Sequence, residues 1–71
     1  MAKRMQCKGF TISERKDGSY RIHLNDGYAE YDTVQKNFFD AGNWVWNMAN
    51  NHTHAHIVNE RMCEVFGKTF G

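Results

Sequence analysis

The chain contains no proline, and no apolar run among its 71 residues approaches the roughly 20 that a membrane-spanning helix needs. Its first residues, Met1-Ala-Lys-Arg-Met-Gln, lack the apolar stretch of a secretory signal. Only two cysteines are present, Cys7 and Cys63, and without an export signal we interpret them as reduced thiols. These absences predict a soluble, cytoplasmic protein with closely spaced elements and no membrane partner.

Signatures of catalysis are also missing. The sequence has neither a glycine-rich phosphate loop nor a dinucleotide-binding fingerprint. Its carboxylates are scattered, and Asp17 and Asp26 are explained by turn formation, so no pair suggests general acid and base catalysis. A Cys and His nucleophile is unsupported, because Cys63 lies beside Met62 in an amphipathic helical pattern and no oxyanion-forming loop is visible. We therefore expect a protein that is not an enzyme and needs no cofactor.

Size and composition limit the folds that the chain can form. A chain of 71 residues makes a single domain, 1–71, whose core leaves a margin of only ~3 to 5 kcal/mol. Hydrophobic residues form 41% of the chain, which favours a globular fold over disorder. The net charge of +1 hides an asymmetry, since residues 1–27 carry six basic and three acidic side chains while residues 28–71 carry three and five. The front half is thus the basic half, and residues 1–7 are expected to be a flexible basic arm.

Two Asp-Gly pairs, Asp17-Gly18 and Asp26-Gly27, divide the front half into short alternating segments. Residues 8–15 and 20–24 alternate apolar and polar side chains with the period of two that is typical of half-buried strands. Residues 28–31 fit a third, shorter strand. Asp and Gly tolerate the positive φ angles that tight hairpins require, so the pattern predicts a three-stranded antiparallel meander.

A long aromatic-rich helix is predicted next, with Asp32 or Thr33 as its N-cap and an end near Met48. Its apolar stripe recurs at spacings of three and four: Val34, Phe38, Ala41, Val45 and Met48. Gly42 inside this pattern marks a kink, a close approach to the sheet or a break.

A second, shorter helix is predicted from near Thr53, with Gly67 in the position of a left-handed C-terminal cap. The predicted fold class is therefore α+β, a three-stranded antiparallel meander followed by one long and one short helix packed on one face.

The outward face of the meander is the first candidate functional surface. Arg15 and Arg21 can contact phosphates or base edges of DNA, with His23 beside them. Three further residues can add hydrogen bonds or backbone anchoring: Thr11, Ser13 and Lys8. The alternative is simple solvation, because an antiparallel sheet covered by helices on one side needs a polar outer face.

Aromatic residues provide a second candidate surface. Trp44 falls off the main helical stripe, so it either packs under the C-terminal helix or anchors a partner protein. Tyr28, Tyr31 and Phe70 could belong to the same interface. A small inhibitor or adaptor that binds a host protein, or a homodimer, would use such residues.

A histidine cluster is the third candidate. His52, His54 and His56 supply three imidazoles within five residues, and Cys63 follows seven residues later. A helix would align only His52 with His56. A structural metal, adventitious metal binding and a polar segment with no metal role all remain open.

A family resemblance rests on Ile12-Ser-Glu-Arg-Lys-Asp-Gly-Ser-Tyr-Arg-Ile, the Gly-containing turn that follows, and Tyr31-Asp-Thr at a helix start. Over residues 10–50 these features resemble the arm-binding, AP2-like DNA-binding domains of phage and transposon tyrosine integrases. The resemblance implies that the sheet face reads a DNA major groove through Arg15, Arg21 and His23. We therefore predict a phage-type or mobile-element accessory protein that binds nucleic acid, with protein binding and a metal-stabilised interaction domain as alternatives.

Overall fold

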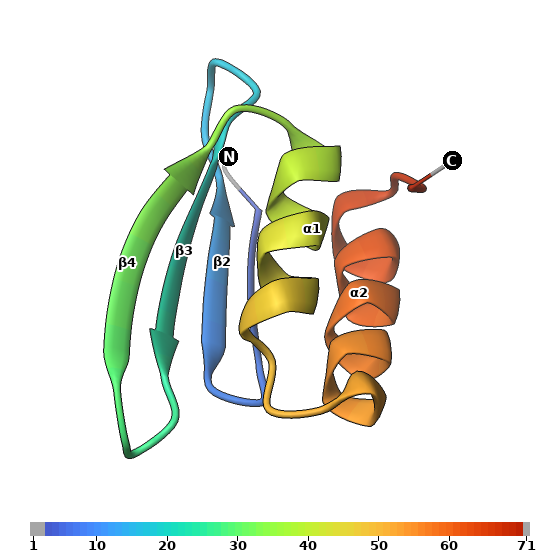
Figure 1. The fold of residues 1–71 in the computed structure, drawn as a ribbon. Helices are drawn as coiled ribbons and strands as arrows, with labels where there is room; N and C mark the ends of the chain where they lie inside the picture. The colour runs from blue at the N-terminus through green and yellow to red at the C-terminus, as the bar shows by residue number, and fades with distance from the viewer. Residues whose placement is uncertain (1–2, 71) are drawn as a thin grey trace.

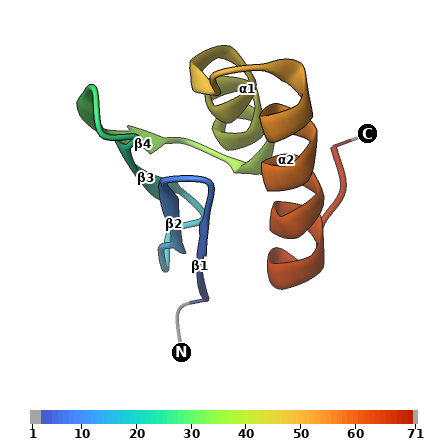
Figure 2. The ribbon, with the colours of Figure 1, turned by 90° about the horizontal axis from the view of Figure 1, so that it is seen from below.

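Residues 3–70, the part of the chain described by the computed structural model, form a four-stranded antiparallel sheet followed by two helices. The elements are β1 (Arg4–Cys7), β2 (Phe10–Glu14), β3 (Tyr20–Asn25), β4 (Glu30–Gln35), α1 (Phe38–Met48) and α2 (His52–Phe66). The strands lie in chain order across the sheet, and both helices cover the same face (Figures 1 and 2). The α+β prediction is confirmed.

The sheet has one strand more than predicted, because Arg4–Cys7 pairs with β2 where we expected a flexible arm. A two-residue turn joins them, with Lys8 at φ 51° and Gly9 at φ 86°, angles that match a type I′ hairpin. The strand is only four residues long and its turn is not an Asp-Gly pair, so its pattern did not stand out. Residues 1 and 2 of the predicted arm lie outside the described residues.

Both predicted Asp-Gly turns are confirmed. Asp17 accepts a hydrogen bond from the Ser19 backbone N–H at 2.9 Å, and Gly18 has φ 90°. Asp26 accepts from the Ala29 N–H at 3.0 Å, and Gly27 likewise has φ 90°. Each carboxylate satisfies the backbone of its own turn, as short acidic side chains commonly do.

The predicted boundary between the last strand and the first helix was wrong. β4 extends to Gln35, and the N-cap of α1 is Asn37, whose side chain accepts from the Asp40 N–H at 2.8 Å. The strand extends further than predicted and the helix begins later, because Tyr31, Thr33 and Val34 are aromatic or β-branched residues that suit a sheet.

The predicted order of a long helix and then a short one is reversed, with 11 residues in α1 and 15 in α2. Asn51 caps α2 by accepting from the His54 N–H at 2.8 Å. Gly67 ends α2 in the left-handed conformation, as predicted, with φ 66°. Within residues 3–70 neither helix has the length and apolar character needed to cross a membrane.

The core lies between the sheet and the two helices. Its fully buried side chains include Phe10, Ile12, Tyr20 and Ile22 from the sheet and Val45, Val58 and Met62 from the helices. Gly42 does mark a close approach, but to the C-terminal tail and not to the sheet. A Cβ atom built on Gly42 would lie 2.1 Å from Cε1 of Phe70, whose ring stacks on Phe38 with centroids 4.4 Å apart.

Candidate functional site

Figure 2 shows that residues 3–70 leave the sheet face opposite the helices uncovered. The register arranges side chains of this face in two rows that cross all four strands. The register places Arg4, Ser13, Arg21 and Val34 side by side in the first row. The second row contains Gln6, Thr11, His23 and Asp32. We call these eight residues the open face.

Four predicted nucleic-acid contacts, Thr11, Ser13, Arg21 and His23, are therefore brought together. They line a shallow hollow of about 280 Å³ with Arg4 and Asp32. Because the strand alternation directs the neighbouring apolar residues into the core, these side chains are left facing solvent.

Arg21 does not stand alone on this face. Its Nε donates to Oδ1 of Asp32 at 3.3 Å and its Nη2 donates to Oδ2 at 2.8 Å. The hydrogen bond and the charge of Asp32 raise the pKa of the Arg21 guanidinium, and the same hydrogen bond lowers the pKa of the Asp32 carboxyl. Asp32, predicted as a helix cap, is thus a strand residue that fixes the orientation of an arginine.

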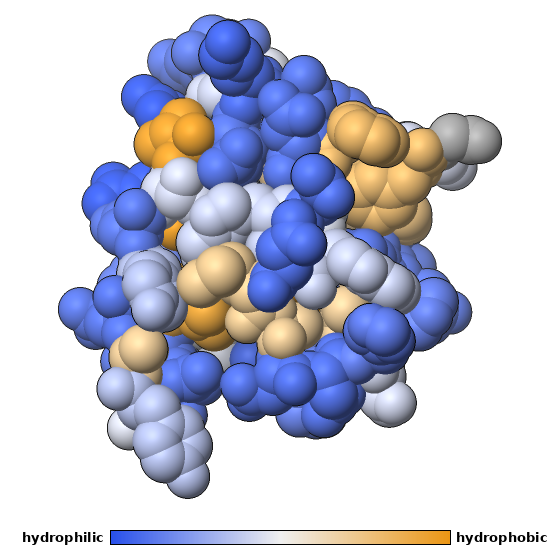
Figure 3. All heavy atoms as spheres, in the orientation of Figure 1, coloured by the Kyte–Doolittle hydropathy of each residue, from blue (hydrophilic) through white to orange (hydrophobic). Residues whose placement is uncertain are grey.

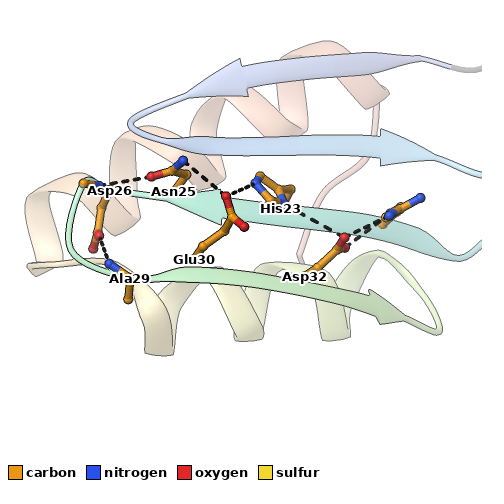
Figure 4. A network of polar contacts seen from close by, with 8 residues as sticks. His23, Asn25, Asp26, Ala29, Glu30 and Asp32 are labelled. Atoms are coloured by element: carbon orange, nitrogen blue, oxygen red, sulfur yellow. Dashed lines mark hydrogen bonds and ion pairs between the residues drawn. The ribbon is translucent and has the colours of Figure 1, made fainter.

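A second acidic side chain lies further along β4 (Figure 4). Oε2 of Glu30 is 3.5 Å from Nε2 of His23 and accepts from Nδ2 of Asn25 at 3.4 Å. The Nδ1 atom of His23 is 3.9 Å from Oδ2 of Asp32. The imidazole therefore lies between two carboxylates, and the β4 side of the open face offsets the positive charge of β3.

The bidentate contact leaves part of the guanidinium available. An arginine carries five N–H donors, and the contacts to Asp32 occupy one on Nε and one on Nη2 of Arg21. Both donors on Nη1 and the second donor on Nη2 remain for a ligand. Since the Arg21 side chain is 63% exposed, these donors are accessible from solvent.

Basic residues gather at the end of the sheet where the β2–β3 hairpin lies. Lys3, Arg15, Lys16 and Lys68 line a hollow of about 550 Å³ together with Glu14. We call these four residues the basic end. Glu14 accepts from the Tyr20 hydroxyl at 2.7 Å, and this hydrogen bond lowers the pKa of the Glu14 carboxyl.

Four cations thus line a hollow with one carboxylate, and the Nζ atom of Lys68 is 3.6 Å from Oε2 of Glu14. The basic end adjoins the open face, since Arg15 and Lys16 also line a hollow shared with Ser13 and Arg21. Lys8, by contrast, lies in the hairpin at the other end of β2 and borders a different hollow with Asp26 and His54. It is the one predicted nucleic-acid contact that is set apart from the rest.

The four aromatic residues predicted as a protein interface do not form one surface. Tyr28 is 97% exposed in the β3–β4 hairpin, and Tyr31 in β4 is about half exposed. Trp44 is partly buried against the core with its ring edge-on to Phe10, at a centroid distance of 6.2 Å. Phe70 packs on Phe38 at the start of α1. Of these four residues, only Tyr28 and Tyr31 are exposed, and they lie three positions apart in the chain.

The predicted metal candidates are not assembled into a site. As expected for a helix, His52 and His56 share a face, where both rings pack on Trp46 at centroid distances of 5.4 and 4.9 Å. His54 borders a different hollow, on the Lys8 side. Across the described part of the chain, no three His, Cys, Asp or Glu side chains come close enough together to hold a metal ion. Cys7 and Cys63 are both free thiols, half-buried beside the core.

The sequence patterns did not identify several residues of this surface. Arg4 was assigned to the flexible arm, and Lys68 to the acidic half of the chain, although the fold brings it to the basic end. Asp32 was missed as a counter-charge because the predicted third strand ended at Tyr31, and Glu30, which lies inside that strand, was not paired with β3. Extending that strand from the Asp26-Gly27 turn would have placed Asp32 opposite His23, which is the register observed.

Comparison with known proteins adds no relative, since no protein-family model, no curated protein and no solved structure matches this chain.

Proposed function

We propose that this protein binds duplex DNA through its open face, with the basic end contacting phosphates. The observation that carries the proposal is the Arg21–Asp32 pair, an exposed arginine held in a fixed orientation with three donors unused. An arginine positioned in this way suits guanine, whose O6 and N7 atoms accept a bidentate pair of N–H groups in the major groove.

The neighbouring side chains support base readout. Ser13 and Thr11 from β2 lie beside Arg21 and His23 from β3 and can donate or accept hydrogen bonds. β-Strands are known to enter DNA grooves with such faces. Within residues 3–70 neither row of the open face contains Phe, Tyr or Trp, and stacking on these residues is how proteins hold single strands. The face therefore favours a duplex over an unpaired strand.

The basic end supplies attraction that does not depend on sequence. The basic end has four cations and a single carboxylate around one hollow at the edge of the face. A phosphate backbone would pass there if the open face entered a groove. Such contacts release counterions, so the affinity falls with added salt. With so few cations, the protein is expected to bind non-specific duplexes weakly.

A binding experiment separates the two kinds of contact. Sites are first selected from a random duplex pool, and the affinity for the selected duplex is then measured at about 50 mM and about 200 mM salt. Arg15→Ala should weaken all duplexes alike and reduce the salt slope by about 1, because it removes one phosphate contact. Arg21→Ala should cost about 1–3 kcal/mol and relax the preference at one guanine position.

Two matched controls distinguish a local effect from a change of net charge. Arg61 is exposed on α2, on the other side of the molecule from the open face, so Arg61→Ala removes the same charge and should leave DNA affinity nearly unchanged. Asp32→Asn should strengthen non-specific binding but weaken guanine discrimination, since Arg21 loses the group that orients it. Absence of binding to any duplex at the lower salt concentration, with the variants still folded, would refute the proposal.

A further inference from the structure

The two edge strands of the sheet differ in length. β1 has four residues, whereas β4 has six and contains no proline, glycine or lysine, and each of them contacts one helix, β1 with α2 and β4 with α1. Among residues 3–70, three of the four large exposed hydrophobic side chains lie in β4 or in its hairpin: Tyr28, Tyr31 and Val34. Figure 3 shows a hydrophobic patch at the surface on the β4 side, in addition to hydrophobic patches at the centre of this view and on the side of the helices. Long edges without such protection readily pair with another strand.

The direction of the backbone groups of β4 follows from the hydrogen bonds at the hairpins. The Asn25 N–H donates to Gly9 on the β2 side, and the Asp26 N–H donates to Ala29 on the β4 side. Backbone groups alternate along an antiparallel ladder, so Tyr31, Thr33 and Gln35 bond to β3. The N–H and C=O groups of the even-numbered residues of β4, Glu30, Asp32 and Val34, therefore point to the free edge.

Charge and length select one register for pairing between two copies of this edge. In an antiparallel sheet, two directly opposed residues have their side chains on the same face. A twofold axis between two copies of β4 must therefore place one residue directly opposite its own copy, and cannot lie between two successive residues. Centring on Asp32 sets two carboxylates opposite each other, which is unfavourable. Centring on Val34 leaves Glu30 and Tyr31 beyond the end of the pairing. Centring on Thr33 pairs Tyr31–Gln35 of the two copies and places Glu30 opposite Lys36, the first residue after the strand.

We propose that this protein forms a weak twofold dimer in which β4 pairs antiparallel with β4 of a second copy, with Thr33 opposite Thr33. In this register Glu30 lies opposite Lys36 of the second copy, so opposite charges meet at both ends of the pairing. Asp32 lies opposite Val34 and Tyr31 opposite Gln35. The dimer has one eight-stranded sheet with its four helices on the same side, and the two open faces become continuous. This inference does not depend on DNA binding.

Disulfide trapping tests both the dimer and its register. Thr33 is in a non-hydrogen-bonded position, where opposed Cα atoms are ~4.5 Å apart, within the range that a disulfide bridges. Thr33→Cys should therefore double in mass on a non-reducing gel after mild oxidation. Tyr31→Cys is the matched control, because two Tyr31 residues would be offset by four positions, or about 13 Å. Wild-type protein treated in parallel gives the background from Cys7 and Cys63.

A charge exchange tests the same register without cysteine. Glu30→Lys and Lys36→Glu should each weaken self-association about fivefold, as each places like charges together twice in the dimer, and the double variant should restore it. Sedimentation of the wild type should show the average mass rising between about 10 μM and about 1 mM. A monomer throughout this range, equal trapping of Thr33→Cys and Tyr31→Cys, or no restoration in the double variant would overturn the proposal.

Discussion

Replacing Gly42 with alanine should destabilise this protein, although the same change in an ordinary helix is stabilising. Alanine is favoured over glycine in a helix interior by about 1 kcal/mol. At this position, however, the new Cβ would lie 2.1 Å from Cε1 and 2.5 Å from Cζ of Phe70. Neither distance is compatible with van der Waals packing, so the Phe70 ring must leave its place on Phe38.

The magnitude follows from the interactions that hold the Phe70 ring in place. Its stack on Phe38, with centroids 4.4 Å apart and planes 14° apart, is worth about 1 kcal/mol. The ring is only partly buried, so removing its apolar surface from water contributes about 1 kcal/mol more, roughly half the value for a fully buried side chain. Set against the gain in helix propensity, the net effect of Gly42→Ala is a destabilisation of about 1 kcal/mol, or a fall in melting temperature of about 5 °C for a domain of this size.

A double-mutant cycle isolates the effect. Phe70→Ala alone should cost about 2 kcal/mol, and Gly42→Ala introduced into that variant should restore about 1 kcal/mol, because the clash no longer exists. Urea unfolding followed by tryptophan fluorescence gives all four free energies. If Gly42→Ala stabilises the wild type as much as it stabilises Phe70→Ala, then Phe70 does not pack over Gly42 in solution.

Two further predictions concern the hydrogen bonds that hold the elements in place. The pKa of Glu14 is lowered by the Tyr20 hydroxyl, so its contribution to stability is complete above the ordinary value of 4.5 and is lost as the pH falls through the lower folded-state pKa. The free energy of unfolding should therefore fall below about pH 5, and less steeply in Glu14→Gln; equal slopes would contradict this. Asn37→Ala and Asn51→Ala should each cost about 1 kcal/mol in urea unfolding, because each removes a helix N-cap, whereas Asn47→Ala in the last turn of α1 should cost much less.

The parts of the fold that the sequence predicted are those specified by local chemistry. Each Asp-Gly turn contains the carboxylate and the glycine that its own backbone needs, and the alternation in β2 and β3 places Ile12 and Ile22 inside and Arg21 outside. Gly67 likewise needs only its own helix to be recognised as a cap. These features could be identified because no distant residue alters them.

The errors arose where one residue suits two structures. Val34 fits the apolar stripe of the predicted helix, yet it is also a β-branched residue at the end of a strand, and the pairing with β3 decides between them. Asn37, with Asp40 three residues later, was the better N-cap signal. The Asn37 side chain accepts from the Asp40 backbone N–H, and its Nδ2 lies 3.5 Å from the Asp40 carboxylate. The Arg21–Asp32 contact was hidden by the same error, because it depends on the extent of β4.

The charges on the open face also restrict the kind of DNA binding that is physically reasonable. A surface that held DNA by charge alone would leave its arginines unpaired, but Arg21 shares its charge with Asp32, and His23 lies between two acids. In the proposed DNA complex, the monomer would therefore gain much of its affinity from contacts with bases, with modest help from the basic end. Pairing through β4 would double the number of both contacts on one continuous surface, which raises affinity without new residues. Since a twofold protein matches a twofold sequence, the symmetry of the selected DNA sites would report whether the monomer or the dimer is the form that binds.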